Sequence, residues 1–171
     1  MKTDNVLATR PHKVIYRDGD RVWKVFDANY PKTDVLNEAL NQARVEETGL
    51  PIPRVHGVTV NEEGKWAIIS DYIEGETLAE KMAKDPENVE KYMKEFVEIQ
   101  LEIHDKTAPL LNKMKDKMSV RINSLKAVNA TTRYELSTRL ESMPKHKKVL
   151  HGDFNPTNVV IDKDGKYYIL D

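Results

Sequence analysis

The chain has 171 residues, of which 39% are hydrophobic and 32% are charged, a mixture typical of a folded soluble protein. Its 27 basic and 28 acidic residues leave a formal net charge of −1, which gives no electrostatic reason to expect binding to nucleic acid or to a membrane. Cysteine is absent, so disulfides, zinc–thiolate sites and cysteine nucleophiles are excluded. The sequence also has no signal-peptide pattern at its start and no apolar run of membrane-spanning length, so we expect a cytoplasmic location.

The first part of the chain is predicted to form an antiparallel sheet with one helix. The expected strands occupy residues 6–8, 13–17, 21–26, 55–60 and 65–71. The turn Asp18-Gly19-Asp20 between the second and third of them is typical of a hairpin. The helix is expected at residues 34–48, where Gly49 ends it. Its predicted buried stripe consists of Leu36, Ala39, Leu40 and Ala43.

The rest of the chain is predicted to be mainly helical and to end in a hairpin. Helices are expected from about Thr77, at 87–106, at 111–128 and at 131–143, and the hairpin arms at 159–161 and 166–170. In the longest helix, helical spacing relates Val89, Tyr92, Met93, Phe96, Val97 and Ile103. The pattern predicts an α+β protein with an N-terminal lobe (residues 1–73), a second part (residues 74–171) and a ligand cleft between them.

The most informative segment is a polar loop between two apolar runs, His151-Gly152-Asp153-Phe154-Asn155-Pro156-Thr157-Asn158. Asp171 follows Asn158 by thirteen residues, at the end of the last expected strand. A hairpin returns its end to its beginning, so Asp153, Asn158 and Asp171 are expected to converge. Carboxylate and amide oxygens are ligands that suit Mg²⁺.

This segment resembles the catalytic loop of the aminoglycoside phosphotransferase and choline kinase superfamily, in which His-Gly-Asp is followed by Asn five residues after the Asp. The resemblance implies a protein-kinase-like fold and Mg²⁺-dependent transfer of the γ-phosphoryl group of ATP or GTP to a hydroxyl group of a small molecule. It implies that Asp153 is the catalytic base and that Asn158 and Asp171 are metal ligands. His151 is expected to hold the loop by hydrogen bonds rather than to do chemistry.

Other segments follow the order of the same superfamily. Lys24, within Val22-Trp23-Lys24-Val25, resembles the strand lysine that contacts the α and β phosphates, and Glu38 resembles the helix glutamate that pairs with it. Asp71-Tyr72-Ile73 resembles the connector whose backbone groups bind adenine. Thr9-Arg10-Pro11-His12 stands where protein kinases have a glycine-rich loop, but it contains no glycine, so no phosphate-binding role is assigned to it.

Two other classes of protein stay open. One is a nucleotide-binding pseudokinase or interaction module that lacks catalysis, and the other is a helical adaptor, which leaves the polar loop unexplained. Superfamily members continue well beyond the position of Asp171, so we expect a C-terminally truncated chain of low activity that self-associates through an uncovered face. The acceptor stays open among aminoglycosides, choline-like alcohols, macrolides and sugars.

Overall fold

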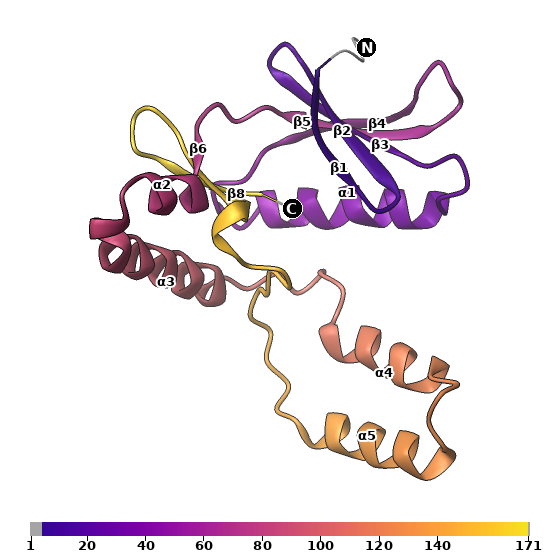
Figure 1. Ribbon diagram of the computed structural model, residues 1–171. Coiled ribbons are helices and arrows are strands. Elements are labelled where there is room, and N and C mark those ends of the chain that lie inside the picture. The colour runs from indigo at the N-terminus through magenta and orange to yellow at the C-terminus, as the bar shows by residue number, and fades with distance from the viewer. Residues whose placement is uncertain (1–4, 171) are drawn as a thin grey trace.

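A computed structural model describes residues 5–170 as two antiparallel sheets with helices (Figure 1). The first sheet has the strand order β1-β2-β3-β5-β4. Its strands and the helix that packs on it are β1 (Val6–Arg10), β2 (Lys13–Asp18), β3 (Arg21–Phe26), α1 (Lys32–Glu46), β4 (Val55–Val60) and β5 (Trp66–Asp71). All five expected strands are confirmed, with ends that differ by at most two residues.

Helix α1 buries only part of the expected stripe. Its buried residues are Val35 and Ala39, which pack in one core with Phe26 of β3. The expected burial of Ala39 is therefore confirmed, whereas Leu36 and Leu40 are 42% and 48% exposed. Each leucine follows a buried residue by one position, which turns it by about 100° around the helix axis. The prediction for the two leucines was wrong because the sheet contacts the face that carries Val35 and Ala39.

The second part of the chain contains four helices and the second sheet. These elements are β6 (Glu76–Thr77), α2 (Leu78–Lys84), α3 (Val89–Asp105), α4 (Met114–Ser124), α5 (Ala130–Ser142), β7 (Val159–Ile161) and β8 (Tyr167–Ile169), with 3-10 turns at Pro86–Asn88 and Pro156–Asn158. Helices α4 and α5 pack against each other and extend away from both sheets (Figure 1). Within residues 5–170, no helix has both the length and the apolar character needed to cross a membrane.

Gly75 lies where the chain enters the second sheet. A Cβ atom at this position would lie 2.3 Å from the carbonyl oxygen of Ile161. The next residue, Glu76, pairs with Ile161 in the ladder between β6 and β7. Glycine is therefore required at position 75, because any side chain would push β6 away from β7.

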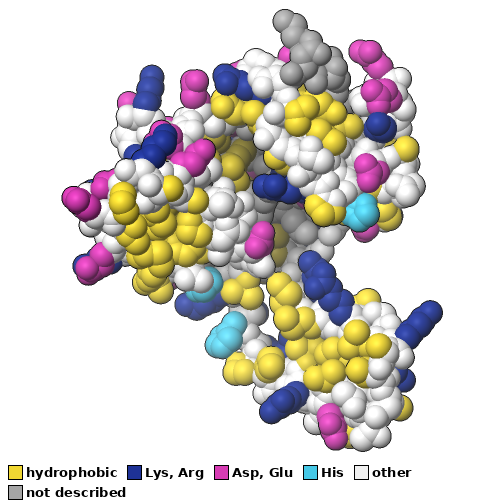
Figure 2. All heavy atoms as spheres, viewed as in Figure 1, with side chains coloured by type: hydrophobic (Ala, Val, Ile, Leu, Met, Phe, Trp, Pro, Cys, Tyr) yellow, Lys and Arg dark blue, Asp and Glu magenta, His cyan; other side chains and the backbone are white. Residues whose placement is uncertain are grey.

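Helix α3 has apolar residues on two faces, of which only one reaches the core. Its buried residues are Ile99 and Ile103. Four exposed apolar residues, which we call the α3 stripe, repeat every fourth position: Val89, Met93, Val97 and Leu101. Figure 2 shows hydrophobic side chains gathered on the surface at this helix. Val89, Met93 and Val97 have the expected helical spacing, but they lie outside the core because the apolar arc of α3 is wider than the core beneath it.

The end of β5 is held by a charged cluster around Asp71. The Oδ1 atom of Asp71 accepts a hydrogen bond from Nη1 of Arg21 at 2.5 Å and lies 2.6 Å from Nε2 of His56. Its Oδ2 atom accepts from the backbone N–H of Arg54 at 3.1 Å. Burial alone would raise the pKa of Asp71, but the hydrogen bonds from His56 and Arg54 and the charges of His56 and Arg21 lower it below its usual value. The ionised carboxylate thus ties together β3, β4 and β5.

The lowered pKa of Asp71 predicts a specific acid sensitivity. The carboxylate stabilises the fold above the unfolded-state pKa of 3.8, and this stabilisation is lost as the pH falls through the lower folded-state pKa. We expect Asp71→Asn to melt at a lower temperature than the wild type at neutral pH, with a gap that narrows below about pH 4. Thermal unfolding followed by circular dichroism measures this gap, and a gap that does not change with pH would contradict the assignment.

The core around α2 gives a prediction for stability. Leu78 is 0% exposed, so Leu78→Ala should lower the free energy of unfolding by about 2–5 kcal/mol. Leu110, which lies between α3 and α4, is 67% exposed, and Leu110→Ala is the matched control, with an expected change within about 0.5 kcal/mol. Urea unfolding measures both variants. Similar losses in the two would contradict the assignment of Leu78 to the core.

Candidate active site

Lys24 and Glu38 form the ion pair that the order of strand and helix predicts. Lys24 lies on β3, on the same face as Phe26, and is only 8% exposed. Its Nζ atom lies 3.5 Å from Oε1 of Glu38 on α1. Both residues line a cavity of about 790 Å³, which we call the lysine cavity. A buried ammonium group needs an opposite charge, and Glu38 supplies one where the ammonium faces open space.

Lys13 is a third charged residue beside Lys24 and Glu38, and it was not predicted from the sequence. Its Nζ atom donates to the same Oε1 atom of Glu38 at 2.9 Å. The signal was present in the β2–β3 hairpin, where Ile15 pairs with Lys24. Alternate residues of a strand share a face, so Lys13 is placed on the side of Lys24. Lys13 also lines the lysine cavity.

His151 ties the polar loop to the end of β8. The backbone N–H of Asp153 donates to Nδ1 of His151 at 3.3 Å, so the proton of the neutral ring is assigned to Nε2. That Nε2 atom donates to the carbonyl oxygen of Leu170 at 2.8 Å. The next apolar residue, Phe154, stacks on Phe96 of α3 with ring centroids 4.3 Å apart. The expected hydrogen-bonding role of His151 is confirmed.

Asn158 is buried and its side-chain amide is oriented by the loop itself. Its Nδ2 atom donates to the carbonyl oxygen of Asp153 at 3.0 Å, which leaves Oδ1 as the accepting end of the amide. The carbonyl of Asn158 accepts from the backbone N–H of Leu170 at 2.8 Å. The beginning of β7 and the end of β8 therefore lie together, as the hairpin predicts. The residue Asp153 is exposed to solvent.

The chemistry of Asn158 fits a hard cation such as Mg²⁺, because an oriented amide oxygen is a suitable ligand. The other expected ligand, Asp171, lies outside the described residues. Within residues 5–170, no group of three or more His, Cys, Asp and Glu side chains is arranged to hold a metal ion. In this part of the chain, Asn158 is therefore the residue through which the expected metal would be held.

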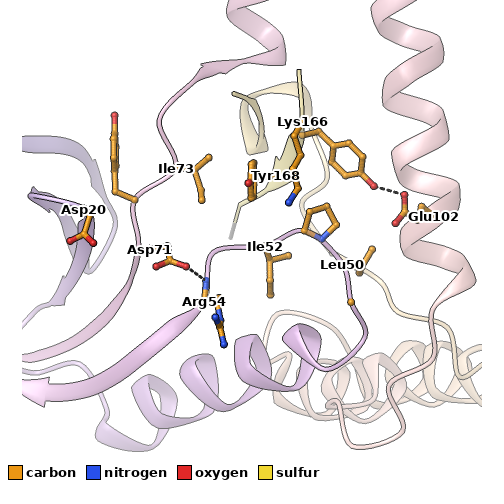
Figure 3. A pocket seen from close by; sticks show the side chains of 13 residues that line it. Asp20, Leu50, Ile52, Arg54, Asp71, Ile73, Glu102, Lys166 and Tyr168 are labelled. Atoms are coloured by element: carbon orange, nitrogen blue, oxygen red, sulfur yellow. Dashed lines mark hydrogen bonds between the residues drawn. The ribbon is translucent and has the colours of Figure 1, made fainter. Parts of the chain in front are cut away.

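The connector residues Asp71, Tyr72 and Ile73 line a second cavity, of about 740 Å³ (Figure 3). The backbone N–H of Asp71 donates to the carbonyl of Arg54 at 3.0 Å, and that of Tyr72 donates to the carbonyl of Asp20 at 2.9 Å. These two N–H groups are therefore already used within the protein. The expected recognition of adenine by the connector stays a prediction.

The far wall of the second cavity is formed by β8 and α3. Tyr167 donates a hydrogen bond to Glu102 there (Figure 3). Burial, followed by the hydrogen bond to Glu102 and its negative charge, raises the pKa of Tyr167, so the hydroxyl keeps its proton at neutral pH. Leu50 and Ile52 line both cavities, which places the segment after α1 between them.

The residues that the sequence assigned to one site therefore line different cavities or none. Lys24 and Glu38 line the lysine cavity, whereas the three connector residues line the second cavity. Asp153 and Asn158 line neither cavity. The polar loop is nevertheless joined to the lysine cavity, because His151 and its partner Leu170 both line it.

Residues 12–171 match a family described as the phosphotransferase enzyme family. A thermostable mutant of aminoglycoside phosphotransferase APH(4)-Ia has a similar structure, with a TM-score of 0.64 and 17% identity over 97% of this chain and 65% of that one. A choline/ethanolamine kinase family protein from Mesorhizobium loti gives a TM-score of 0.56 and 18% identity over 98% and 56% of the two chains. An aminoglycoside-3'-phosphotransferase of type VIII gives 0.56 and 17% over 100% and 69%. No curated protein sequence matches the chain significantly.

These structures confirm the α+β, kinase-like fold with its N-terminal antiparallel sheet. The chain spans 56–69% of their lengths. A further variant of thermostable aminoglycoside phosphotransferase APH(4)-Ia, solved in a ternary complex with AMP-PNP and hygromycin B, has a TM-score of 0.62 to this chain. On the match over residues 12–171, the chain belongs to the phosphotransferase enzyme family.

Proposed function

We propose that the chain carries the nucleotide-binding and catalytic residues of a phosphotransferase that moves the γ-phosphoryl group of ATP or GTP to a hydroxyl group of a small molecule. The observation that carries the proposal is the ion pair between buried Lys24 and half-buried Glu38, on the wall of a cavity that His151 also lines. A fixed ammonium group beside open space is suited to a phosphate. The family supports phosphoryl transfer, and a relative bound to AMP-PNP and hygromycin B supports a nucleotide donor and a small-molecule acceptor.

The catalytic part of the proposal rests on the polar loop. Asp153 accepts or orients the proton of the acceptor hydroxyl, and its exposure leaves it accessible to an acceptor. Asn158 and Asp171 would hold Mg²⁺, which would supply positive charge beside the phosphate oxygens. The hydrogen bonds of His151 and Asn158 fix the loop backbone around Asp153, so the carboxylate is presented from a defined position.

The nucleotide part rests on the N-terminal lobe, residues 1–73, with residues 74–171 as the second part. Lys24, held by Glu38, contacts the α and β phosphates. Backbone groups of Asp71, Tyr72 and Ile73, other than the two N–H groups already bonded to Arg54 and Asp20, bind adenine. Because the reaction consumes ATP, we place it in the cytoplasm.

The first test replaces the proposed base. In a version of the protein extended to the length of its structural relatives, Asp153→Asn should lower turnover by about 10²-fold or more, because a positioned general base is lost, while the affinity for Mg-ATP changes little. Turnover is measured as ADP release with hygromycin B, kanamycin and choline as acceptors, and affinity by calorimetry. Asp164→Asn, in the exposed β7–β8 turn, is the matched control and should retain activity.

The outcomes of this test separate the candidate functions. Near-normal turnover in Asp153→Asn would remove Asp153 as the base. An extended protein that binds Mg-ATP but transfers the phosphoryl group to no acceptor would favour the pseudokinase alternative. Failure to bind any nucleotide would overturn the proposed function.

The α3 stripe supports a further part of the proposal, which is self-association of the chain. Val89, Met93, Val97 and Leu101 are between 37% and 62% exposed, and apolar surface gains about 25 cal/mol per Å² when it leaves water. Because the stripe repeats every fourth residue along a single helix, the stripe of a second copy matches it in an antiparallel helix pair.

Self-association predicts a concentration-dependent dimer. Sedimentation velocity of the wild type should show it, and Val97→Asp should shift the protein to the monomer, because a carboxylate would have to enter the apolar contact. Val120→Asp is the control, since Val120 lies on α4 and is 69% exposed outside the stripe. A wild type that stays monomeric at all concentrations would refute the contact.

A further inference from the structure

The carboxylate of Glu38 binds two lysines, and the lysine that no motif assigns is the nearer one. Nζ of Lys13 lies 2.9 Å from Oε1 of Glu38, whereas Nζ of Lys24 lies 3.5 Å from the same atom. The side chain of Lys13 is only 19% exposed, and its ammonium group lies 5.6 Å from the ring centroid of Phe26. Lys13 is therefore held in place inside the fold rather than extended into water.

The position of Lys13 follows from the turn between β1 and β2. His12 adopts a φ of 69°, in the left-handed region that glycine favours. The carbonyl of His12 accepts from the backbone N–H of Asp27 at 2.9 Å, and its ring lies 3.5 Å from the Asp27 carboxylate. These contacts tie the turn to the segment before α1. The first side chain after the turn, Lys13, then reaches the lysine cavity.

This turn occupies the place of the glycine-rich loop, whose backbone N–H groups contact phosphates in protein kinases. Here the residues Arg10 and Lys13 pair across the β1–β2 ladder, and the carbonyl of His12 is bound to Asp27. The backbone at the turn is thus engaged in the sheet and with the segment before α1. At this end of β2, the side chain of Lys13 lines the lysine cavity.

The charges of the trio favour an anion with several negative oxygens. Lys13, Lys24 and Glu38 together carry two positive charges and one negative charge. Both ammonium groups lie within 3.5 Å of the same oxygen atom, close enough to each other for one polyphosphate chain to contact both. An ammonium group has three N–H donors, so Lys13 can keep its bond to Glu38 and donate to a phosphate as well.

We propose that Lys13 is a second phosphate-binding lysine, which contacts the polyphosphate of the nucleotide beside Lys24 while it holds Glu38. The inference rests on the proposed function, because it concerns the same nucleotide. The side chain of Lys13 would thus contact phosphate at the end of the sheet where protein kinases use backbone groups.

The test compares the affinities of Mg-ATP and adenosine, measured by calorimetry on the full chain. Lys13→Met should weaken Mg-ATP about tenfold, the effect of losing one charge-assisted hydrogen bond, and should leave adenosine unchanged, because adenosine has no phosphate. Lys13→Arg, which keeps the charge, should recover most of the affinity for Mg-ATP. Lys65→Met is the matched control, since it removes a lysine that is paired with Glu63 in the turn between β4 and β5, outside the cavity.

Each outcome decides the inference. Lys13→Met that binds Mg-ATP as the wild type does, or that loses adenosine and Mg-ATP equally, would overturn it, the second because the lysine would then act only on the fold. Lys24→Met separates this failure from that of the proposed function: if Lys24→Met loses Mg-ATP and Lys13→Met does not, only the role of Lys13 falls. If the wild type binds no Mg-ATP, both fall together.

Discussion

The carboxylate of Glu38 is where helix α1, strand β2 and strand β3 meet. Helix α1 begins after Pro31 without a side-chain cap and buries only Val35 and Ala39 fully. Two small apolar contacts hold a helix on a sheet but define its rotation poorly, whereas an ion pair has a direction. The bonds from Lys13 and Lys24 to one oxygen of Glu38 therefore determine which side of α1 faces the cavity. Removing Glu38 would leave two ammonium groups without their shared counter-charge, whereas removing either lysine leaves one ion pair.

The segment after α1 connects the helix that carries Glu38 to the second sheet. Gln42 donates to the carbonyl of Pro53 at 2.8 Å, and the backbone N–H of Ile169 donates to the carbonyl of Pro51 at 2.8 Å. Leu50 packs in the same core as Ile169. Because the next residue, Leu170, accepts from His151, the helix that carries Glu38 and the loop that carries Asp153 are built on one connected set of contacts. The distance between a bound phosphate and the proposed base thus depends on the short segment from 49 to 54.

Much of the fold could be predicted because its signals are local. Alternating residues and the turn at Asp18-Gly19-Asp20 define the strands, and Gly49, with a φ of 77°, lies just beyond the end of α1 as expected. The buried faces of α1 and α3 could not be predicted in the same way. Periodicity gives the spacing of apolar residues, but when these residues occupy more than one face, the partner surface selects the face that is buried.

In the candidate site too, contacts between residues close in sequence could be predicted, whereas contacts between distant residues could not. The role of His151 was predictable because its partner Asp153 is two residues away, in a motif of defined spacing. The cluster of Arg21, His56 and Asp71 was not, because its members are separated by 15 to 50 residues and meet only through the register of three strands. Asp71 was assigned to adenine recognition by its place in the chain. The structure shows that its carboxylate contacts Arg21, His56 and the backbone N–H of Arg54.

The turn before Lys13 shows why a departure from a family pattern needs a structure to interpret it. The sequence shows only that glycine is missing from residues 9–12. In the structure, His12 adopts the left-handed conformation itself, and its carbonyl accepts a hydrogen bond from the backbone N–H of Asp27, which stabilises a backbone that a non-glycine residue rarely takes. A turn held in this way has less conformational freedom than a glycine-rich loop. Lys13, the residue after His12, is positively charged, largely buried and turned toward the lysine cavity.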